Sequence, residues 1–294
     1  MSGPVRLFIF GLGYSAQAFV DRFKDRAGSV SGTTRSAERT AKLAANGIQP
    51  FIFDGQSAGD SVAEAVRDAT HLLVSIAPGE SDPVLAHHRE TILAAPNLKW
   101  TGYLSTVGVY GNYGGAWVSE STTPHPTRGR STERLAAEKA WAKLAAERNV
   151  PLATFRIAGI YGPGRNALVN LAEGKAHRIV KAGQVFNRIH VEDIAAALVA
   201  AVDRNSAGIF NLADDEPAPP QDVVAFAASL LGIPPPPEVP FAEADLSPMA
   251  RTFYADNKRV SNKRLRHDLG VALRFPTYRE GLTALWREGT WRGV

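Results

Sequence analysis

Short apolar runs alternate with longer amphipathic segments along the first 160 residues. The runs predict six strands: Arg6–Phe10, Ser29–Thr33, Gln49–Phe53, His71–Ile76, Lys99–Ser105 and Leu152–Ile157. The segments between them predict five helices: Ser15–Arg26, Ala37–Ala45, Ser61–Asp68, Pro83–Ala95 and Thr132–Glu147. Strands that alternate with helices are typical of parallel strands joined by crossover helices. The pattern therefore predicts an α/β fold with a doubly wound parallel sheet.

The pattern changes after Gly164. We expect a helix at Ala167–Glu173, a pair of short strands within 178–189, a helix at Val191–Asp203 and a strand at Ile209–Leu212. Prolines at 217, 219, 220 and 234–237 then predict loops around one further helix, Gln221–Leu231. This region is typical of a small lobe, because apolar periodic segments resume after each proline cluster.

The first predicted strand runs directly into a glycine-containing turn and a helix. The turn has the pattern Gly-x-Gly-x-x-Ala, in which Gly11 allows a tight bend and Gly13 lets backbone N–H groups approach a pyrophosphate. The pyrophosphate would lie at the positive end of the helix that begins near Tyr14. Ala16 replaces the third glycine and is still small enough for close packing of helix on strand. The pattern predicts a dinucleotide site, although two glycines after a strand also occur in ordinary turns.

The residue after the second strand indicates which dinucleotide is bound. A site specific for NAD would place Asp or Glu about 20 residues after the glycines, to hold the ribose 2′-hydroxyl. Arg35 stands there, and a guanidinium suits a 2′-phosphate, so the sequence favours NADP over NAD. The alternative is an exposed loop arginine. The predicted cofactor-binding residues are Gly11, Gly13, Tyr14, Ser15, Ala16, Thr34, Arg35, Asp54, Ile76, Ala77 and Tyr161.

Composition narrows the class of protein. Of 294 residues, 45% are hydrophobic and 21% are charged, which is an ordinary globular balance. The absence of cysteine excludes disulfides, thiolate nucleophiles and cysteine metal sites. Lysine and arginine are scattered and the net charge is only +4, so we expect no nucleic-acid partner. No apolar run reaches 18 residues and no signal-type segment begins the chain, so we expect a cytoplasmic protein without membrane association.

Four later segments carry a family resemblance. They are 103–111 (YLSTVGVYG), 155–164 (FRIAGIYGPG), 188–194 (RIHVEDI) and 208–213 (GIFNLA). Together they resemble the extended short-chain dehydrogenase/reductases, the group of the NAD-dependent sugar epimerases and dehydratases. The tail, 260–265 and 276–282, is similar to that group's C-terminal lobe. The resemblance implies a Rossmann-type NAD(P)-binding domain at 1–163 and 188–213, and a small substrate-binding lobe at 164–187 and 214–294.

The resemblance also implies a catalytic trio. In this superfamily a Ser or Thr at the end of the fifth strand binds the substrate oxygen, while a Tyr, with a Lys four residues later, supplies the proton. Thr106 falls on the Ser/Thr position, with Ser105 beside it. The Tyr-x-x-x-Lys pattern is missing, because alignment on Glu138 puts Arg130 and Arg134 at those two positions. The chain therefore resembles the atypical members of the group.

The missing tyrosine leaves several residues with alternative roles. A guanidinium stays protonated above pH 12, so Arg130 cannot exchange a proton as a phenol does. Arg134 could bind the nicotinamide ribose hydroxyls or form an ion pair with Glu138 on an exposed helix face. Tyr110 and Tyr161 are phenols near the expected nicotinamide pocket, and each could act as an acid or serve only for packing, with Tyr161 as a wall of the pocket.

Several histidines and arginines are weaker candidates for catalytic, metal-binding or anion-binding roles. His190 with Asp193 fits a structural strand-to-helix junction better than a base and its orienter. His87 and His88 point apart on a helix and do not chelate together, so no metal site is predicted. Four loop arginines could gather around an anionic group, although scattered surface arginines are commoner: Arg128, Arg165, Arg188 and Arg251.

Two functions remain open from the sequence. The first is an NADP-dependent oxidoreductase or epimerase-like enzyme that acts on a carbonyl or hydroxyl of a small polar, sugar-like substrate, with Thr106 polarising the oxygen. The second is a non-catalytic NADP-binding sensor in which dinucleotide occupancy regulates lobe closure and partner binding. The sequence leaves open the substrate, the direction of reaction and whether the chain forms a homodimer.

Overall fold

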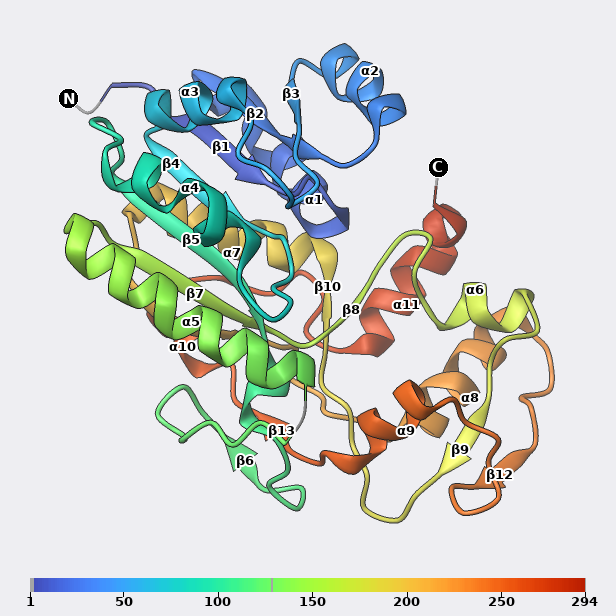
Figure 1. Ribbon diagram of the computed structural model, residues 1–294. Helices are drawn as coiled ribbons and strands as arrows, with labels where there is room; N and C mark the ends of the chain where they lie inside the picture. Colours follow the sequence, from blue (N-terminus) through green and yellow to red (C-terminus); the bar gives the residue numbers. More distant parts are fainter. Residues whose placement is uncertain (1–2, 128, 294) are drawn as a thin grey trace. The chain divides into compact units, whose positions relative to one another are not determined.

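A computed structural model describes residues 3–127 and 129–293. Its largest sheet has the strand order β11-β7-β5-β4-β1-β2-β3 (Figure 1). The seven strands are β1 (Arg6–Phe10), β2 (Ser29–Thr34), β3 (Gln49–Ile52), β4 (His71–Val74), β5 (Trp100–Thr106), β7 (Leu152–Ile157) and β11 (Gly208–Leu212). Neighbours from β3 to β5 pair in parallel, as predicted. The α/β Rossmann-type fold is thereby confirmed, and the six strands predicted in the first 160 residues all form.

The sheet reverses its strand order at β1. This strand pairs with β2 on one side and with β4 on the other, so that Phe8 lies opposite both Ser31 and Leu72. In open parallel sheets, ligands bind beyond the carboxyl ends of the strands at such a reversal. Gly11 and Gly13 follow β1 directly and therefore lie at this point.

Helices connect and cover these strands. They are α1 (Tyr14–Phe23), the 3-10 turn η1 (Lys24–Arg26), α2 (Ala37–Ala45), α3 (Asp60–Asp68), α4 (Pro83–Leu93), α5 (Gly129–Arg148) and α7 (Val191–Arg204). Successive packing places α3, α4 and α5 side by side along one face of the sheet (Figure 1). On α5, the side chains of Ala137, Trp141 and Leu144 are buried. These side chains join Phe8 and Tyr103 in one apolar core, which fixes the helix on the sheet.

Internal contacts divide the chain into two compact units. Unit 1 comprises residues 1–106, 128–156 and 194–210, and unit 2 comprises 107–127, 157–193 and 211–294. The predicted cofactor domain and substrate lobe assign functions to similar but not identical stretches.

Unit 2 is built from short elements. They are η2 (Val107–Tyr110), β6 (Trp117–Val118), β8 (Gly159–Tyr161), α6 (Ala167–Ala172), β9 (Arg178–Val180), β10 (Arg188–His190), α8 (Pro220–Leu231), β12 (Glu238–Pro240), α9 (Pro248–Ala255), β13 (Arg259–Val260), α10 (Lys263–His267), α11 (Tyr278–Arg287) and η3 (Thr290–Arg292). Three two-stranded parallel pairs form: β10 with β8, β12 with β9, and β13 with β6. A core that includes Leu168, Ala227, Tyr278 and Leu282 joins α6, α8 and α11.

Two predictions for this region were wrong. Both short strands within 178–189 form, but β9 pairs with β12 and β10 pairs with β8, so they are not a pair. The C-terminal third also holds α9, α10 and α11 in addition to the one predicted helix. The prolines at 219 and 220 were interpreted only as loop residues, whereas Pro220 is the first residue of α8 and Pro219 is its N-cap. Proline in a first helical turn is favourable, because the N–H that it lacks has no partner there.

Candidate cofactor and active site

Gly11 is required by the fold itself. Its φ is +90°, a region that residues with side chains rarely adopt. A Cβ at this position would also come within 2.8 Å of Cγ1 of Ile76. The Gly11 N–H donates to Oγ1 of Thr33 at 2.8 Å, which ties the turn to β2. Two of the predicted cofactor-binding positions, Gly11 and Ile76, therefore lie in contact at the ends of β1 and β4.

Gly13 is not required by the backbone. Its φ is −86°, and a Cβ built there would meet no atom within 4 Å. Gly13 is the N-cap of α1, no side chain caps this helix, and its first turn holds no acidic residue. A helix N-terminus carries a partial positive charge and favours an anion. The glycine thus keeps open the space in front of a helix end that suits a pyrophosphate.

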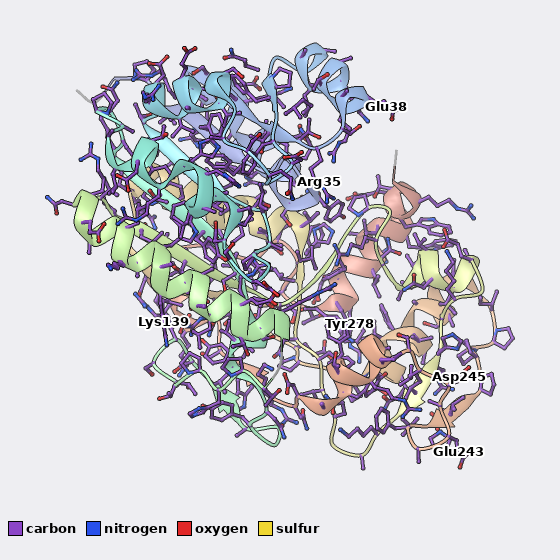
Figure 2. The ribbon with its side chains drawn as sticks, viewed as in Figure 1. Arg35, Glu38, Lys139, Glu243, Asp245 and Tyr278 are labelled. Atoms are coloured by element: carbon purple, nitrogen blue, oxygen red, sulfur yellow. The ribbon has the colours of Figure 1, made fainter. Side chains whose placement is uncertain are left out.

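Arg35 follows β2 and is exposed (Figure 2). Among the residues that the structure describes, it has no hydrogen-bond or ion-pair partner. Arg39, on α2, donates from Nη2 to the carbonyl oxygen of Leu12 at 2.9 Å, so a second guanidinium lies against the glycine turn. Sequence reasoning missed Arg39, although its position one helical turn after Arg35 was a usable indication.

The other predicted cofactor-binding residues have simpler surroundings. Ser15 and Ala16 are buried in the first turn of α1, whereas the Tyr14 side chain is exposed. Thr34 is buried, and its Oγ1 accepts from the Ser36 N–H at 3.3 Å. Asp54 is exposed and its Oδ1 accepts from the Gln56 N–H at 2.8 Å, which makes a local turn. Ala77 follows β4 in the same loop as Ile76, and the role of all of these residues toward a cofactor stays a prediction.

The two hydroxyls at the end of β5 differ in their surroundings. Ser105 is buried and donates its hydrogen to Oε1 of Glu138. That carboxylate also accepts from Arg156, from Nε at 3.1 Å and from Nη2 at 2.7 Å. Thr106 is the last residue of β5 and is half-buried. The Ser105 hydrogen is bound inside unit 1, and Thr106, which holds the family's Ser/Thr position, stays the candidate for contact with a substrate.

The two arginines at the positions of the missing Tyr and Lys behave differently. Arg134 donates from Nη1 to the carbonyl oxygen of Leu104, and its guanidinium lies 5.9 Å from the centre of the Tyr103 ring. It forms no ion pair with Glu138, so this alternative is not realised among the described residues. Arg134 instead ties α5 to the carboxyl end of β5. Arg130 is exposed near the start of α5.

Both remaining phenols belong to unit 2 and are held in its interior. The Tyr110 hydroxyl is buried and donates to Oδ1 of Asn211 at 2.8 Å. The Tyr161 hydroxyl donates to the carbonyl oxygen of Thr277 at 3.3 Å, and burial raises the pKa of Tyr161 well above its usual value. A phenol with a raised pKa exchanges its proton poorly near neutral pH. These surroundings favour packing roles for both.

The histidines have structural surroundings. His190 is fully buried, burial lowers its pKa to about 4, and Nδ1 accepts from the Glu192 N–H at 3.2 Å. Asp193 accepts from the N–H groups of Arg274 and Phe275, at 2.7 and 3.1 Å, at the start of α7. His88 is buried against two phenylalanine rings in unit 1. In the described part of the chain, no group of three or more His, Cys, Asp or Glu residues is placed to hold a metal.

Similarity to known proteins agrees with this geometry. Residues 86–213 match the model of the NAD dependent epimerase/dehydratase family. The match covers less than half of the chain. A conserved protein of unknown function from Silicibacter pomeroyi is 45% identical to this chain, with a TM-score of 0.86, over 96% of this chain and 98% of that one.

Two named proteins are more distant. A 3-diazoavenalumate denitrifying reductase from Streptomyces sp is 29% identical over 255 residues, which are 83% of this chain and 71% of that protein. The structure of UDP-glucuronic acid 4-epimerase from Bacillus cereus in complex with NAD has a TM-score of 0.76 at 16% identity, over 97% of this chain and 98% of that one. This last likeness concerns the fold alone.

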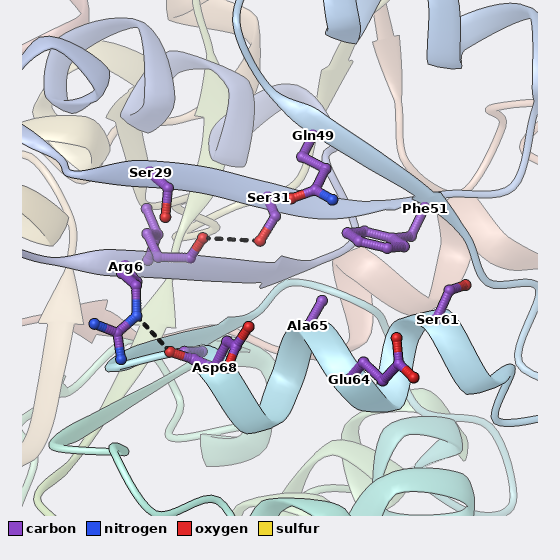
Figure 3. A pocket seen from close by; sticks show the side chains of 11 residues that line it. Arg6, Ser29, Ser31, Gln49, Phe51, Ser61, Glu64, Ala65 and Asp68 are labelled. Carbon is purple, nitrogen blue, oxygen red and sulfur yellow. Dashed lines mark hydrogen bonds between the residues drawn. The ribbon is translucent and has the colours of Figure 1, made fainter.

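A hollow in unit 1 lies away from the strand ends that bear the glycine turn. Its volume is about 330 Å³, and its lining includes Arg6, Ser29 and Gln49, the first residues of β1, β2 and β3 (Figure 3). Helix α3 forms its other wall, where Nε of Arg6 donates to the carbonyl oxygen of Asp68 at 2.6 Å. Because the hollow is at the amino ends of the strands, it is not the dinucleotide site.

The four loop arginines differ in their exposure. Of the four loop arginines, Arg128 lies outside the described residues, Arg165 and Arg251 are exposed, and Arg188 is half-buried. No helix in the described ranges combines the length and the apolar character that crossing a membrane requires.

Proposed function

We propose that this chain is an NADP-dependent oxidoreductase or epimerase-like enzyme that acts on a carbonyl or hydroxyl of a small polar substrate. The observation that carries the proposal is the open space at Gly13 before the uncapped N-terminus of α1. With it goes the guanidinium of Arg35, just after β2, which has no partner among the residues that the structure describes. The match of residues 86–213 to the NAD dependent epimerase/dehydratase family supports NAD(P) chemistry, and the Streptomyces relative is named a reductase. We also propose that the predicted domain of 1–163 and 188–213 binds the cofactor and that 164–187 with 214–294 binds the substrate.

The proposed roles follow from chemistry of the side chains. Backbone N–H groups at the start of α1 hold the pyrophosphate, and Arg35 pairs with the 2′-phosphate, assisted by Arg39. When bound, the dinucleotide supplies or accepts a hydride. Thr106 donates a hydrogen bond to the substrate oxygen and so stabilises the charge that develops there. Arg134 and Arg130 contribute positive charge and hydrogen bonds but do not exchange protons.

Gly13→Val tests the cofactor site. The open space around Gly13 predicts a folded variant, whereas the new side chain would fill the approach of the pyrophosphate and abolish NADP binding. Gly3→Val is the matched control, since a Cβ at Gly3 also meets no atom within 4 Å and this residue precedes β1. Calorimetry with NADP⁺ and NAD⁺ measures the effect. Unchanged NADP⁺ affinity in Gly13→Val would exclude this turn as the cofactor site.

A second candidate function is the non-catalytic NADP sensor. It is favoured by the buried, hydrogen-bonded hydroxyls of Tyr110 and Tyr161, since neither of these two phenols is prepared to transfer a proton. NADP⁺ binding without consumption of NADPH above the buffer rate, across a broad panel of carbonyl compounds, would support the sensor. Turnover of any of them supports the enzyme.

A further inference from the structure

Arg188 is the first residue of β10, and only part of its guanidinium donates hydrogen bonds to described residues. Its Nη1 donates to the carbonyl oxygens of Phe186 and Ala218, at 2.9 and 3.2 Å. The guanidinium carbon lies 5.9 Å from the centre of the Tyr278 ring. These contacts orient the group. Its Nε and Nη2 atoms make no hydrogen bond to a described residue, and the side chain is half-buried, so one edge of the fork remains available.

Asp214 lies beside this arginine and is almost completely buried, at 2% exposure. Its own N–H donates to the Arg188 carbonyl oxygen at 2.7 Å, and Oδ1 accepts from the Glu216 N–H at 3.2 Å. Oδ2 is buried without a hydrogen-bond partner, as is the hydroxyl of Tyr278. Arg188 and Asp214 interact electrostatically, yet they form no ion pair within 4 Å. Polar atoms buried without partners are costly, so this arrangement points to a missing third group.

We propose that Arg188 and Asp214 form a recognition site for a carboxylate group of the substrate. The proposal rests on the proposed function, because it specifies which substrates that enzyme would take. The Nε–Nη2 edge of a guanidinium matches the two oxygens of a planar carboxylate. Asp214 adds a hydrogen bond from its protonated carboxyl, and the Tyr278 hydroxyl is a further buried donor in the same cluster. Asp215 and Glu216 lie close by, so a singly charged anion is preferred to a doubly charged phosphate.

The protonation of Asp214 gives the site a pH dependence. Burial raises the pKa of Asp214 to about 8; Arg188 opposes this shift, whereas Glu216 and Asp215 add to it. Tyr161, on β8, also faces this carboxyl and stays neutral because its own pKa is raised. Below about pH 8 the Asp214 carboxyl donates a hydrogen bond to a bound carboxylate. Above that pH it is ionised and repels the ligand, so affinity falls.

Calorimetry on the full chain saturated with NADP⁺ tests the site, with benzoate as probe. Benzamide is the neutral analogue of benzoate and tests whether the site requires a negative charge. Phenyl phosphate is a dianion and tests whether the site prefers a single negative charge to two. We expect benzoate to bind more tightly than either. Arg188→Met should weaken benzoate binding about 10- to 100-fold, because a charged, bidentate contact is lost. Arg287→Met is the matched control, since Arg287 is an exposed arginine on α11 and should leave affinity unchanged.

A second pair of variants separates binding from folding. Arg188→Lys keeps the charge and loses the fork, and should weaken benzoate binding even if Arg188→Met fails to fold. Asp214→Asn keeps a neutral donor and should bind benzoate with an affinity that no longer falls between about pH 6 and pH 9. No measurable benzoate binding, equal affinity for benzamide, or parent-like binding by Arg188→Lys would overturn the proposal. Benzoate binding by a chain that never consumes NADPH would instead leave the site standing and refute the proposed enzyme.

Discussion

Each unit places an arginine beside a buried carboxylate, but the two arrangements differ. In unit 1, Arg156 and Glu138 meet through two hydrogen bonds, and Ser105 donates a third to the same carboxylate. In unit 2, Arg188 and Asp214 lie close together without an ion pair, and one carboxylate oxygen has no partner. Both oxygens of the Glu138 carboxylate therefore accept hydrogen bonds inside unit 1. The second arrangement leaves polar atoms for another molecule.

The contrast separates charged residues that stabilise the fold from charged residues that are available to bind a ligand. Glu138 and Arg156 connect α5 to β7, and Glu138 also binds Ser105 near the end of β5. These bonds are therefore part of the fold. Breaking such a pair leaves an isolated buried charge, which is far more costly than the net gain from forming it. Arg188 and Asp214 do not satisfy each other, so their replacement should affect binding more than folding.

The largest expected effect is on the stability of unit 1. Glu138→Ala leaves Arg156 buried without its carboxylate and should lower the free energy of unfolding by about 3–5 kcal/mol. Urea denaturation followed by circular dichroism measures it. The double variant Glu138→Met with Arg156→Met should recover most of the loss, because no charge remains buried. A loss below about 1 kcal/mol for Glu138→Ala would remove the contrast between the two arrangements.

Thr106→Val tests the neighbouring pair of hydroxyls. The substitution keeps the shape of the side chain and removes its donor, so turnover should fall about 10²- to 10³-fold while NADP affinity barely changes. Steady-state kinetics on any substrate found by screening provide the measurement. Ser105→Ala is the control and should act mainly on stability, because the Ser105 hydrogen is bound to Glu138. Equal turnover by Thr106→Val and the parent would count against Thr106.

Arg35 gives a third contrast, since its side chain has no hydrogen-bond or ion-pair partner in the part of the chain that the structure describes. Arg35→Asp should reverse the cofactor preference from NADP to NAD, with a loss of about 1.5–3 kcal/mol in NADP binding free energy. Comparison of the two dissociation constants by calorimetry decides it. If the parent chain binds both cofactors equally, the interpretation of Arg35 fails.

The elements of unit 1 were predicted from the sequence more completely than those of unit 2. In unit 1, apolar runs and helical periodicity specify each element locally, so the strands and the glycine turn were predictable from the sequence. In unit 2, β9 pairs with β12 across about 60 residues, and no local pattern encodes that partner. The partners of Ser105, Arg134 and Tyr110 were equally hidden, because they come from contacts between distant segments.

The smallest expected effect concerns how stability depends on pH. With its pKa raised from 3.8 to about 8, Asp214 stays protonated in the folded chain where the unfolded chain has released the proton. Stability therefore falls as pH rises through this window. The buried His88 of unit 1 acts in the opposite direction, because its pKa is lowered to about 4 and the unfolded chain takes up protons below pH 6.5. Asp214 and His88 thus limit stability from opposite sides of the pH scale.

Asp214→Asn removes the alkaline limit alone. Its melting temperature should exceed that of the parent by about 2–4 °C at pH 9 for each kcal/mol recovered, and by less at pH 5. His88→Leu should instead raise stability only below about pH 6, because it removes a group that gains a proton on unfolding. Thermal denaturation of both variants from about pH 4 to pH 9 measures the two slopes. A pH-independent difference between parent and Asp214→Asn would mean that Asp214 is already ionised in the folded chain, and that its charge is balanced by Arg188 as fully as that of Glu138 is by Arg156.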